Sequence, residues 1–307
     1  MSAQHLKVIA LGLLVLLLLW GGSELLSHGS DAVTGSLGLP VVSPDSVDTI
    51  SVIKGADSIV LVKQAPSGWR VNGHRAAPDV ARDVLQALND TARPELVAQD
   101  PSSFARLGVD SVGGRWLSVR RGGKAPLALI VGGRGSDYQS AYARRPGDAH
   151  VYLWRGRLPA LVDRAADDWR DKRIATLAMD SVTAVDVARG KDRYSLRRSG
   201  RVWTLNGGSI DSAAVARYLD RLKTITAAGF ATAKAADSIK ARAARSITVR
   251  GAGGVVLSLA LDSTAAGFLV HHLAGVGGEG ATVYRIDSWD ADGITPTSRS
   301  LRPAQKK

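Results

Sequence analysis

The chain has 307 residues, 45% of them hydrophobic, and is therefore long enough to bury one or two ordinary hydrophobic cores. It contains no cysteine, which excludes disulfide bonds, thiol chemistry and a lipid attached through cysteine. Its formal net charge is +12, so its surface could attract anionic lipids, acidic polysaccharides or nucleic acids.

The N-terminal region is the most apolar part of the chain. Residues 8–26 come close to the roughly 20 apolar residues that span a bilayer. Lys7 precedes this stretch and no further Lys or Arg occurs before Lys54, which favours a cytoplasmic N-terminus. We therefore predict a cytoplasmic stub at residues 1–7 and a single-pass anchor in the inner (cytoplasmic) membrane, with the remaining chain in the periplasm or outside. The alternative is a cleaved signal peptide. Residues 27–43, rich in Gly, Ser and Val, are expected to be a flexible tether.

An internal repeat organises the rest of the chain. Residues 45–73 and 180–207 both pass from Asp-Ser-Val through alternating apolar residues to a Gly turn and a Trp-x-x-Asn-Gly ending. The paired residues are Asp45 and Asp180, Val52 and Val187, Gly55 and Gly190, Trp69 and Trp203, Asn72 and Asn206, and later Tyr152 and Tyr284. Because these residues are in register with both flanks, we predict two homologous domains, at residues 44–155 and 180–289.

The first repeat is expected to form strands before and after its helical segments. Alternating apolar residues predict strands at 50–52, 59–63 and 69–71, and the Asn-Gly dipeptide that follows is a strong turn signal. A helix is expected from Pro78 and Asp79. Its apolar stripe consists of Val80, Val84, Leu85 and Leu88. A second short helical piece is expected at 101–107, and further strands at 116–119, 127–131, 142–144 and 151–154.

The second repeat predicts the same succession. Asp211 is the expected cap of its main helix. The apolar stripe of that helix consists of Val215, Tyr218, Leu219, Leu222 and Ile225. A helical piece is expected at 235–244, and strands at 185–187, 194–196, 203–205, 247–249, 255–261, 268–271 and 283–286. Each domain is therefore predicted to have an α+β fold, with a largely antiparallel sheet and one or two helices on one face. Residues 156–179 are expected to be a helical connector, and residues 290–307 a disordered basic tail.

The order of these features resembles a known bacterial family. The features are the anchor, the opening at residues 45–52, Trp69-Arg70-Val71 at the end of a hairpin, the helix at 77–88, the strand and Gly turn at 129–132, Val151-Tyr152 and the connector sequence at 169–174. Together they resemble the family called domain of unknown function 4340. The resemblance implies a membrane-associated accessory role, often near gliding-motility-type ABC transport systems, and it supplies no catalytic residues. Asp262-Ser263 replaces Gly132-Gly133 in the second repeat, so the resemblance supports no ligand role for that turn.

Basic residues are concentrated in two regions. They are Arg115, Arg120, Arg121, Lys124, Arg134, Arg144, Arg145, Arg155 and Arg157 in the first repeat, and Arg189, Lys191, Arg193, Arg197, Arg198 and Arg201 in the second. Two interpretations are open: solvated strand faces, or a surface for anionic lipid or polysaccharide. Nucleic acid is disfavoured by the export signal and by the lack of aromatic residues among the basic ones.

The sequence offers few groups for nucleotide or metal binding. Residues 132–136 are Gly-rich and basic, but no helix pattern or Lys-Ser/Thr pair follows, so we expect a plain hairpin loop. His271 and His272 are adjacent on a predicted strand. Their side chains should therefore point to opposite faces and are poorly placed to bind one metal ion.

Catalytic patterns are equally scarce. No Gly-x-Ser-x-Gly nucleophile elbow occurs, and Asp167, Asp168 and Asp171 lie on the Arg-rich connector, where pairing at helical spacing accounts for them. We therefore predict no enzymatic activity, no metal and no cofactor, and the ligand-binding residues are left unassigned.

The predicted function is that of a non-enzymatic, membrane-anchored extracytoplasmic interaction protein. Its expected partner is a membrane protein, with components of an ABC-type transporter as candidates. The alternative is a module that binds an anionic envelope polymer or a lipid surface, indicated by the Arg residues between 115 and 157.

Overall fold

The computed structural model describes residues 37, 39–66, 68–90, 94–122, 124–137, 139–236, 243–277, 279 and 281–303. The contacts divide the chain into two compact units, each treated by itself below. Unit 1 comprises Met1–Asn72 and Asp79–Arg164, and unit 2 comprises Gly73–Pro78 and Ala165–Lys307. The predicted stub and membrane anchor lie outside the described residues. Within the described residues, the structure contains no helix with the length and hydropathy needed to cross a membrane.

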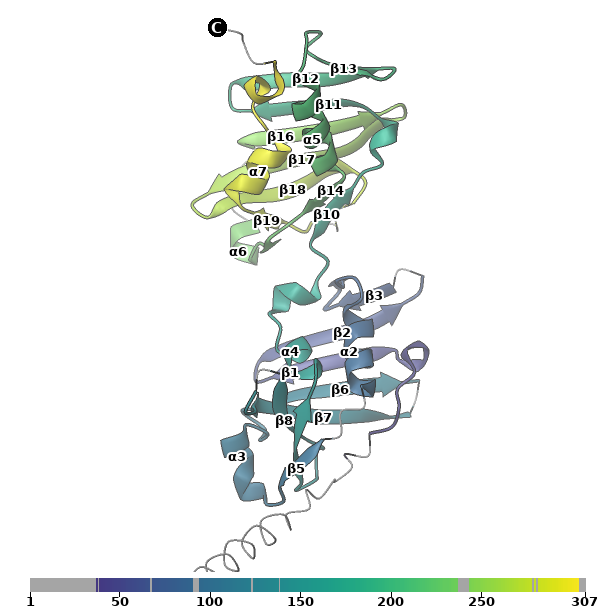
Figure 1. Ribbon diagram of the computed structural model, residues 1–307, viewed down its shortest axis with the longest axis vertical. Coiled ribbons are helices and arrows are strands. Elements are labelled where there is room, and N and C mark those ends of the chain that lie inside the picture. Colours follow the sequence, from purple (N-terminus) through teal and green to yellow (C-terminus); the bar gives the residue numbers. More distant parts are fainter. Residues whose placement is uncertain are drawn as a thin grey trace, which may run out of the picture. The chain divides into compact units, whose positions relative to one another are not determined.

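Unit 1 is built on an antiparallel sheet (Figure 1). Its strands are β1 (Thr49–Lys54), β2 (Asp57–Gln64), β3 (Gly68–Val71), β5 (Glu95–Ala98), β6 (Arg115–Arg121), β7 (Lys124–Arg134), β8 (Ser140–Arg144) and β9 (Val151–Arg155). With the two-residue strand β4 (His74–Arg75), the order in the sheet is β4-β3-β2-β1-β6-β7-β8-β9-β5. The alternation that predicts β1 is visible in its burial, because Ile50 and Val52 face the core and their neighbours do not.

Two helices cover one face of this sheet. They are α2 (Val80–Asn89) and α4 (Leu158–Val162), which lie in front of the strands in Figure 1. The predicted apolar stripe of α2 is confirmed, since Val80, Val84, Leu85 and Leu88 are all buried. Short helical turns complete the unit: η1 (Pro44–Ser46), η2 (Pro101–Ser103) and α3 (Phe104–Leu107).

Unit 2 repeats this arrangement. Its strands are β10 (Arg173–Thr176), β11 (Val182–Arg189), β12 (Asp192–Ser199), β13 (Val202–Leu205), β14 (Thr224–Thr226), β15 (Gly229–Phe230), β16 (Arg245–Gly251), β17 (Gly254–Thr264), β18 (Gly267–Gly275) and β19 (Tyr284–Ile286). Eight of them form a sheet in the order β13-β12-β11-β16-β17-β18-β19-β15, and β10 pairs with β14 separately. The order matches β3-β2-β1-β6-β7-β8-β9-β5 of unit 1 strand for strand. The prediction of an α+β fold with a largely antiparallel sheet is confirmed.

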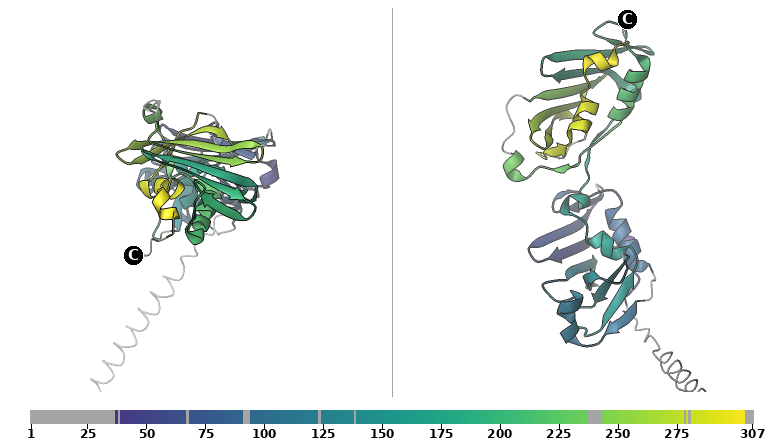
Figure 2. Two further views of the ribbon diagram at one scale, coloured as in Figure 1. Left: turned by 90° about the horizontal axis from the view of Figure 1, so that it is seen from above. Right: turned by 60° about the vertical axis from the view of Figure 1, so that its left-hand side comes forward.

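The helices of unit 2 also lie on one side of its sheet, as the left view of Figure 2 shows for α5 (Ser212–Leu222) and α7 (Ser288–Ile294). Asp211 caps α5 as predicted, because its Oδ1 accepts hydrogen bonds from the backbone N–H groups of Ala213 and Ala214 at 2.9 and 3.0 Å. The remaining helical pieces are α6 (Ala233–Ala236), η3 (Ala166–Trp169), η4 (Met179–Ser181) and η5 (Ser298–Leu301).

The Asn-Gly turns of both repeats have the backbone conformation that this dipeptide favours. Asn72 and Gly73 have φ angles of 47° and 84°, and Asn206 and Gly207 have 50° and 78°. The side chain of each asparagine also forms a hydrogen bond with the backbone of the strand that precedes it in the sheet. The Oδ1 of Asn72 accepts a hydrogen bond from the N–H of Val60 at 2.8 Å, and the Oδ1 of Asn206 accepts one at 2.8 Å from Ser195.

Three predicted segments differ from the structure. The tail expected to be disordered from residue 290 is ordered as far as Pro303, because α7 and η5 bury Ala291, Ile294 and Leu301 against unit 2. The connector expected to be helical at 156–179 contains only α4 and η3 as helix before the chain extends into β10. At the end of the segment expected to be a flexible tether, Val42 is buried and exchanges two backbone hydrogen bonds with the side chain of Asn89, at 2.8 and 2.7 Å.

Candidate functional site

The sequence predicts a plain hairpin loop at residues 132–136, and the structure places the last two of them in the hairpin between β7 and β8 and the first three at the end of β7. Gly132 and Gly133 belong to β7, where the chain that follows α3 crosses the sheet. A Cβ atom on Gly132 would lie 2.6 Å from the backbone oxygens of both Leu107 and Gly108. Glycine is therefore required at position 132 for a close approach of two backbones.

The predicted pairing of the connector carboxylates at helical spacing is found for Asp168 alone, since Asp171 pairs with Arg173 two residues away at the start of β10. The Nζ of Lys172 lies 2.6 Å from Oδ1 of Asp168, at the i,i+4 spacing. Asp171 accepts two hydrogen bonds from the guanidinium of Arg173, at 3.0 Å from Nε and 2.9 Å from Nη2. Among the described residues, no group of three or more His, Cys, Asp or Glu could hold a metal ion.

The basic residues of the first repeat are largely engaged. Arg115 pairs with Asp163, and Arg155 lies 3.1 Å from Glu95. Arg144 is buried, donates to the backbone oxygen of Val109 at 2.7 Å, and stacks at 4.0 Å on the ring of Phe104. Desolvation lowers the pKa of Arg144 below its ordinary value. These contacts indicate that much of the Arg cluster of unit 1 is structural.

The basic residues around β12 are different. Within the part of the chain that the structure describes, Lys191, Arg193, Arg197 and Arg201 form no ion pair. Arg193 and Arg197 lie two strand positions either side of Ser195, so all three share the face of β12 that is turned away from the helices. The carboxylate of Asp186 lies on this face opposite Ser195, where it accepts a hydrogen bond from the Ser195 hydroxyl at 2.7 Å and pairs with Arg250 at 2.9 Å, so basic residues outnumber acidic ones on it.

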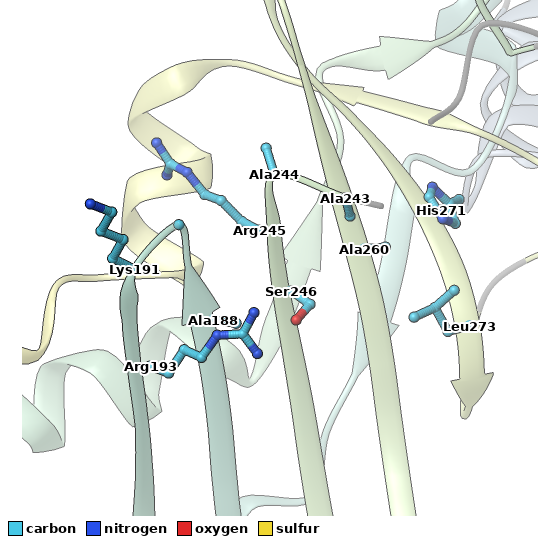
Figure 3. Close-up of a pocket in the computed structure, with 11 residues that line it drawn as sticks. Ala188, Lys191, Arg193, Ala243, Ala244, Arg245, Ser246, Ala260, His271 and Leu273 are labelled. Atoms are coloured by element: carbon cyan, nitrogen blue, oxygen red, sulfur yellow. The ribbon is translucent and has the colours of Figure 1, made fainter. Parts of the chain in front are cut away.

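A cavity of about 630 Å³ opens on that same face of the unit 2 sheet (Figure 3). It is lined by Ala188, Gly190, Lys191, Arg193, Ala243, Ala244, Arg245, Ser246, Ala260, His271 and Leu273. Five of these residues form one row across five strands. Arg193 on β12 pairs with Ala188 on β11, which pairs with Ser246 on β16; Ala260 on β17 and His271 on β18 complete the row. The floor of the cavity therefore consists of three small residues between a cation and an imidazole.

Figure 3 shows the guanidinium of Arg193 extending over Ala188 towards Ser246. The side chain of Arg245, in contrast, points away from the cavity, where its guanidinium lies 2.6 Å from Asp292 and 4.4 Å from the ring centre of Phe268. Lys191 belongs to the rim of the cavity, but its side chain also points away from Ser246, so Arg193 is the cation that extends over the cavity floor. No carboxylate is among its described lining residues.

At the far end of the row, His271 is backed by a buried carboxylate. Asp262 is 4% exposed, and its Oδ2 lies 3.6 Å from Nδ1 of His271. Neither carboxylate oxygen of Asp262 has a hydrogen-bond partner among the described residues, and neither has Nδ1 of His271. A buried carboxylate without donors is unfavourable, so a small rotation that brings Nδ1–H onto Asp262 would stabilise the pair.

The predicted separation of the two histidines agrees with this geometry. His272 pairs with Leu259, a core residue, and its Nε2 lies 2.9 Å from the backbone oxygen of Val276. His271 alone reaches the cavity. Ser246 and His271 are separated by β17, about two strand spacings or 9–10 Å between backbones. That distance is too long for the hydrogen bond that a serine nucleophile needs from its base.

The cavity was not apparent from the sequence, although the internal repeat contains its signal. In unit 1 the corresponding row is Ser58, Ile53, Trp116, Ile130 and Arg144. Ile53, Trp116 and Ile130 thus stand where unit 2 has Ala188, Ser246 and Ala260. Comparing the residues that face away from the core in the two repeats would have revealed this loss of side-chain volume.

Two antiparallel sheets, each with helices on one face, define this chain as an α+β protein with a candidate binding pocket in its second unit. The family model described as Domain of unknown function (DUF4340) matches residues 69–244. The match covers more than half of the chain, which therefore belongs to this family, as its sequence features predict. No curated protein and no solved structure matches the chain.

Proposed function

We propose that this protein is a non-enzymatic, membrane-anchored interaction protein that acts outside the cytoplasm and is built from two copies of one duplicated domain. The observation that carries the proposal is an apolar surface on unit 1. Ile53, Val62 and Trp116 are 41%, 47% and 37% exposed, and they lie on the sheet face opposite α2 and α4. Exposed apolar patches on soluble domains are typical of protein-binding surfaces.

The composition of this surface favours a protein partner over a polyanion. Ile53 and Trp116 are directly opposite each other on β1 and β6. Aromatic residues in this setting commonly anchor protein interfaces. With the predicted anchor at residues 8–26, the expected partner is another membrane protein, and components of an ABC-type transporter are the candidates that we propose.

Site-specific photo-crosslinking in membranes tests this proposal. A photoreactive amino acid at position 116 should give a discrete adduct with a membrane protein, and Ile53→Asp, directly opposite position 116, should abolish that adduct. Val202 on β13 is 65% exposed but lies outside the surface, so the same label at position 202 is the matched control. Absence of an adduct at position 116, or equal adducts at both positions, would contradict the proposal.

A second candidate function is binding to an anionic envelope polymer or lipid surface. It is favoured by Lys191, Arg193, Arg197 and Arg201, which form no ion pair in the described part of the chain. Full-length protein in detergent should bind immobilised anionic polysaccharide or anionic nanodiscs, and binding should weaken steeply with added salt because exposed charges are screened. Lack of binding at low salt would exclude this candidate.

A further inference from the structure

The two units differ most clearly in the side chains of one row of their sheets. Bulky Ile53, Trp116 and Ile130 of unit 1 correspond to Ala188, Ser246 and Ala260 of unit 2. In unit 1, Ile130 is fully buried beneath Leu107 and Val109, in a small core of its own. The small residues of unit 2 instead leave the cavity of about 630 Å³. Sites for small molecules typically measure about 300–1,000 Å³.

The two units also differ two residues further along the same strand, where unit 2 has Asp262 and unit 1 has Gly132. Asp262 follows Ala260 by two residues on β17, as Gly132 follows Ile130 on β7. Gly132 allows the backbone of Leu107 and Gly108 to lie directly against the sheet, with 2.6 Å to a hypothetical Cβ. In unit 2 the corresponding residue, Asp262, has a side chain and is 4% exposed. Asp262 is instead placed against His271, with 3.6 Å between Oδ2 and Nδ1.

The charged residues around the cavity favour an anionic ligand. Lys191 and Arg193 form no ion pair in the described chain, and no carboxylate is among the described lining residues. The hydroxyl of Ser246 lies on the floor next to the guanidinium of Arg193 (Figure 3). Arginine, lysine and hydroxyl groups together are the usual donors to an oxyanion.

The opposite end of the cavity is suited to a second polar group. Since Nδ1 of His271 is turned to Asp262, Nε2 is the ring nitrogen left for a ligand. Between these ends, Ala260 and Leu273 offer apolar contact. The pocket therefore combines an oxyanion end, an apolar floor and an imidazole end.

We propose that unit 2 contains a binding site for a small organic oxyanion, in which Arg193 and Ser246 bind a phosphoryl or carboxylate group and Lys191 adds positive charge at the rim. The body of the ligand lies over Ala260 against Leu273, and His271, which Asp262 positions, contacts its far end. This site rests on neither function proposed above: protein docking uses the surface of unit 1, and binding to a charged surface needs no cavity.

Calorimetric titration of the full-length protein in detergent tests the site. The probes are inorganic phosphate, phenyl phosphate and benzoate, which separate a phosphoryl from a carboxylate preference and free phosphate from an ester with an apolar body. Saturable binding of at least one probe is expected. Arg193→Ala should weaken it by about tenfold or more, because hydrogen bonds to charged groups are stronger than neutral ones. Arg197→Ala removes the same charge from the same face of β12, outside the cavity lining, and should change the affinity by less than about twofold.

Variants with larger side chains in the cavity floor test whether the ligand binds inside the cavity. Ser246→Trp and Ala260→Ile each introduce the residue that unit 1 has at the corresponding position and leave the net charge unchanged. Either variant should abolish binding while the thermal unfolding of the protein stays close to that of wild type. If one of them fails to fold, Ser246→Val or Ala260→Val provides a smaller filling.

Nanodiscs containing phosphatidylglycerol identify a lipid source of the phosphate. Nanodisc binding that Ser246→Trp abolishes would mean that the pocket takes a lipid headgroup. The site is overturned if wild type binds none of the probes or nanodiscs, if the filled variants bind as wild type does, or if Arg197→Ala is as damaging as Arg193→Ala. Nanodisc binding unaffected by Ser246→Trp, together with no binding of the three probes, would overturn the pocket and leave the charged-surface function standing.

Discussion

Asn206 stabilises its turn in two ways: through its backbone conformation and through a hydrogen bond of its side chain. Its φ angle of 50° is one that asparagine tolerates better than most residues, and its Oδ1 accepts a hydrogen bond from the backbone of Ser195 at 2.8 Å. The Oδ1 of Asn72 does the same for Val60 in unit 1. The shared Asn-Gly dipeptide is thus explained by fold stability in both units.

Replacement of Asn206 by alanine should lower the free energy of unfolding by about 1–3 kcal/mol. The variant loses a hydrogen bond and places a Cβ-bearing residue without local polar contacts at positive φ. Urea unfolding measures the change. Ser209→Ala, at an exposed neighbouring position, is the control and should stay within about 0.5 kcal/mol of wild type. Equal stability of the two variants would contradict this role of Asn206.

Tyr218 makes unit 2 sensitive to alkali. Burial raises the pKa of Tyr218 well above its ordinary value, and its hydroxyl donates to the backbone oxygen of Ile294 at 3.1 Å. The unfolded chain therefore releases this proton at lower pH than the folded one. The stabilisation is complete below the pKa of about 10 for an unfolded tyrosine, and it is lost as the pH rises towards the folded value.

Unfolding measured between pH 8 and 11 should show this loss for wild type and a weaker loss for Tyr218→Phe. The phenylalanine variant should be less stable near neutral pH by about 0.5–1.5 kcal/mol, since it lacks the hydrogen bond. Tyr142, which is only partly buried, provides the comparison through Tyr142→Phe. Identical alkaline slopes for wild type and Tyr218→Phe would contradict the prediction.

At the scale of elements, strands with alternating burial and helices with an apolar stripe were predictable. β1 and α2 are examples, because their patterns follow from which side chains face the core. The short strands β5, β10, β14 and β15 were missed, since two to four residues carry no usable period and owe their conformation to a neighbouring strand. The C-terminal helix was missed because it is short and because acidic and other polar residues surround its few apolar ones.

Substitutions in this helix, α7, test whether the C-terminal segment is ordered and packed against unit 2. Ile294→Ala should destabilise the protein by about 2–4 kcal/mol, because Ile294 is buried in the core of unit 2. Trp289 lies on the same helix but is 70% exposed, so Trp289→Ala should cost about 1 kcal/mol or less, mainly its contact with Arg221. A disordered tail would leave both variants as stable as wild type in thermal unfolding.

At the scale of the whole molecule, the division into two compact units predicts two separate cooperative unfolding transitions. Leu222 belongs to the core of unit 2, and Leu85 is buried in unit 1. Leu222→Ala and Leu85→Ala should each cost about 2–5 kcal/mol and each lower a different calorimetric transition. If both variants shifted a single common transition, the units would unfold as one, contrary to this prediction.

The sequence by itself determined the repeat, the α+β class, the main helix of each unit and the family, because these follow from periodicity and from residues close together in the chain. Only the tertiary structure placed Ala188, Ser246 and Ala260 beside one another, since the register of β11 and β16 joins Ala188 to Ser246, more than fifty positions away, and β17 then adds Ala260. Small side chains on separate strands form the cavity, and such residues share no local sequence motif. The cavity becomes visible when strand pairing shows that the bulky row of unit 1 has small counterparts in unit 2.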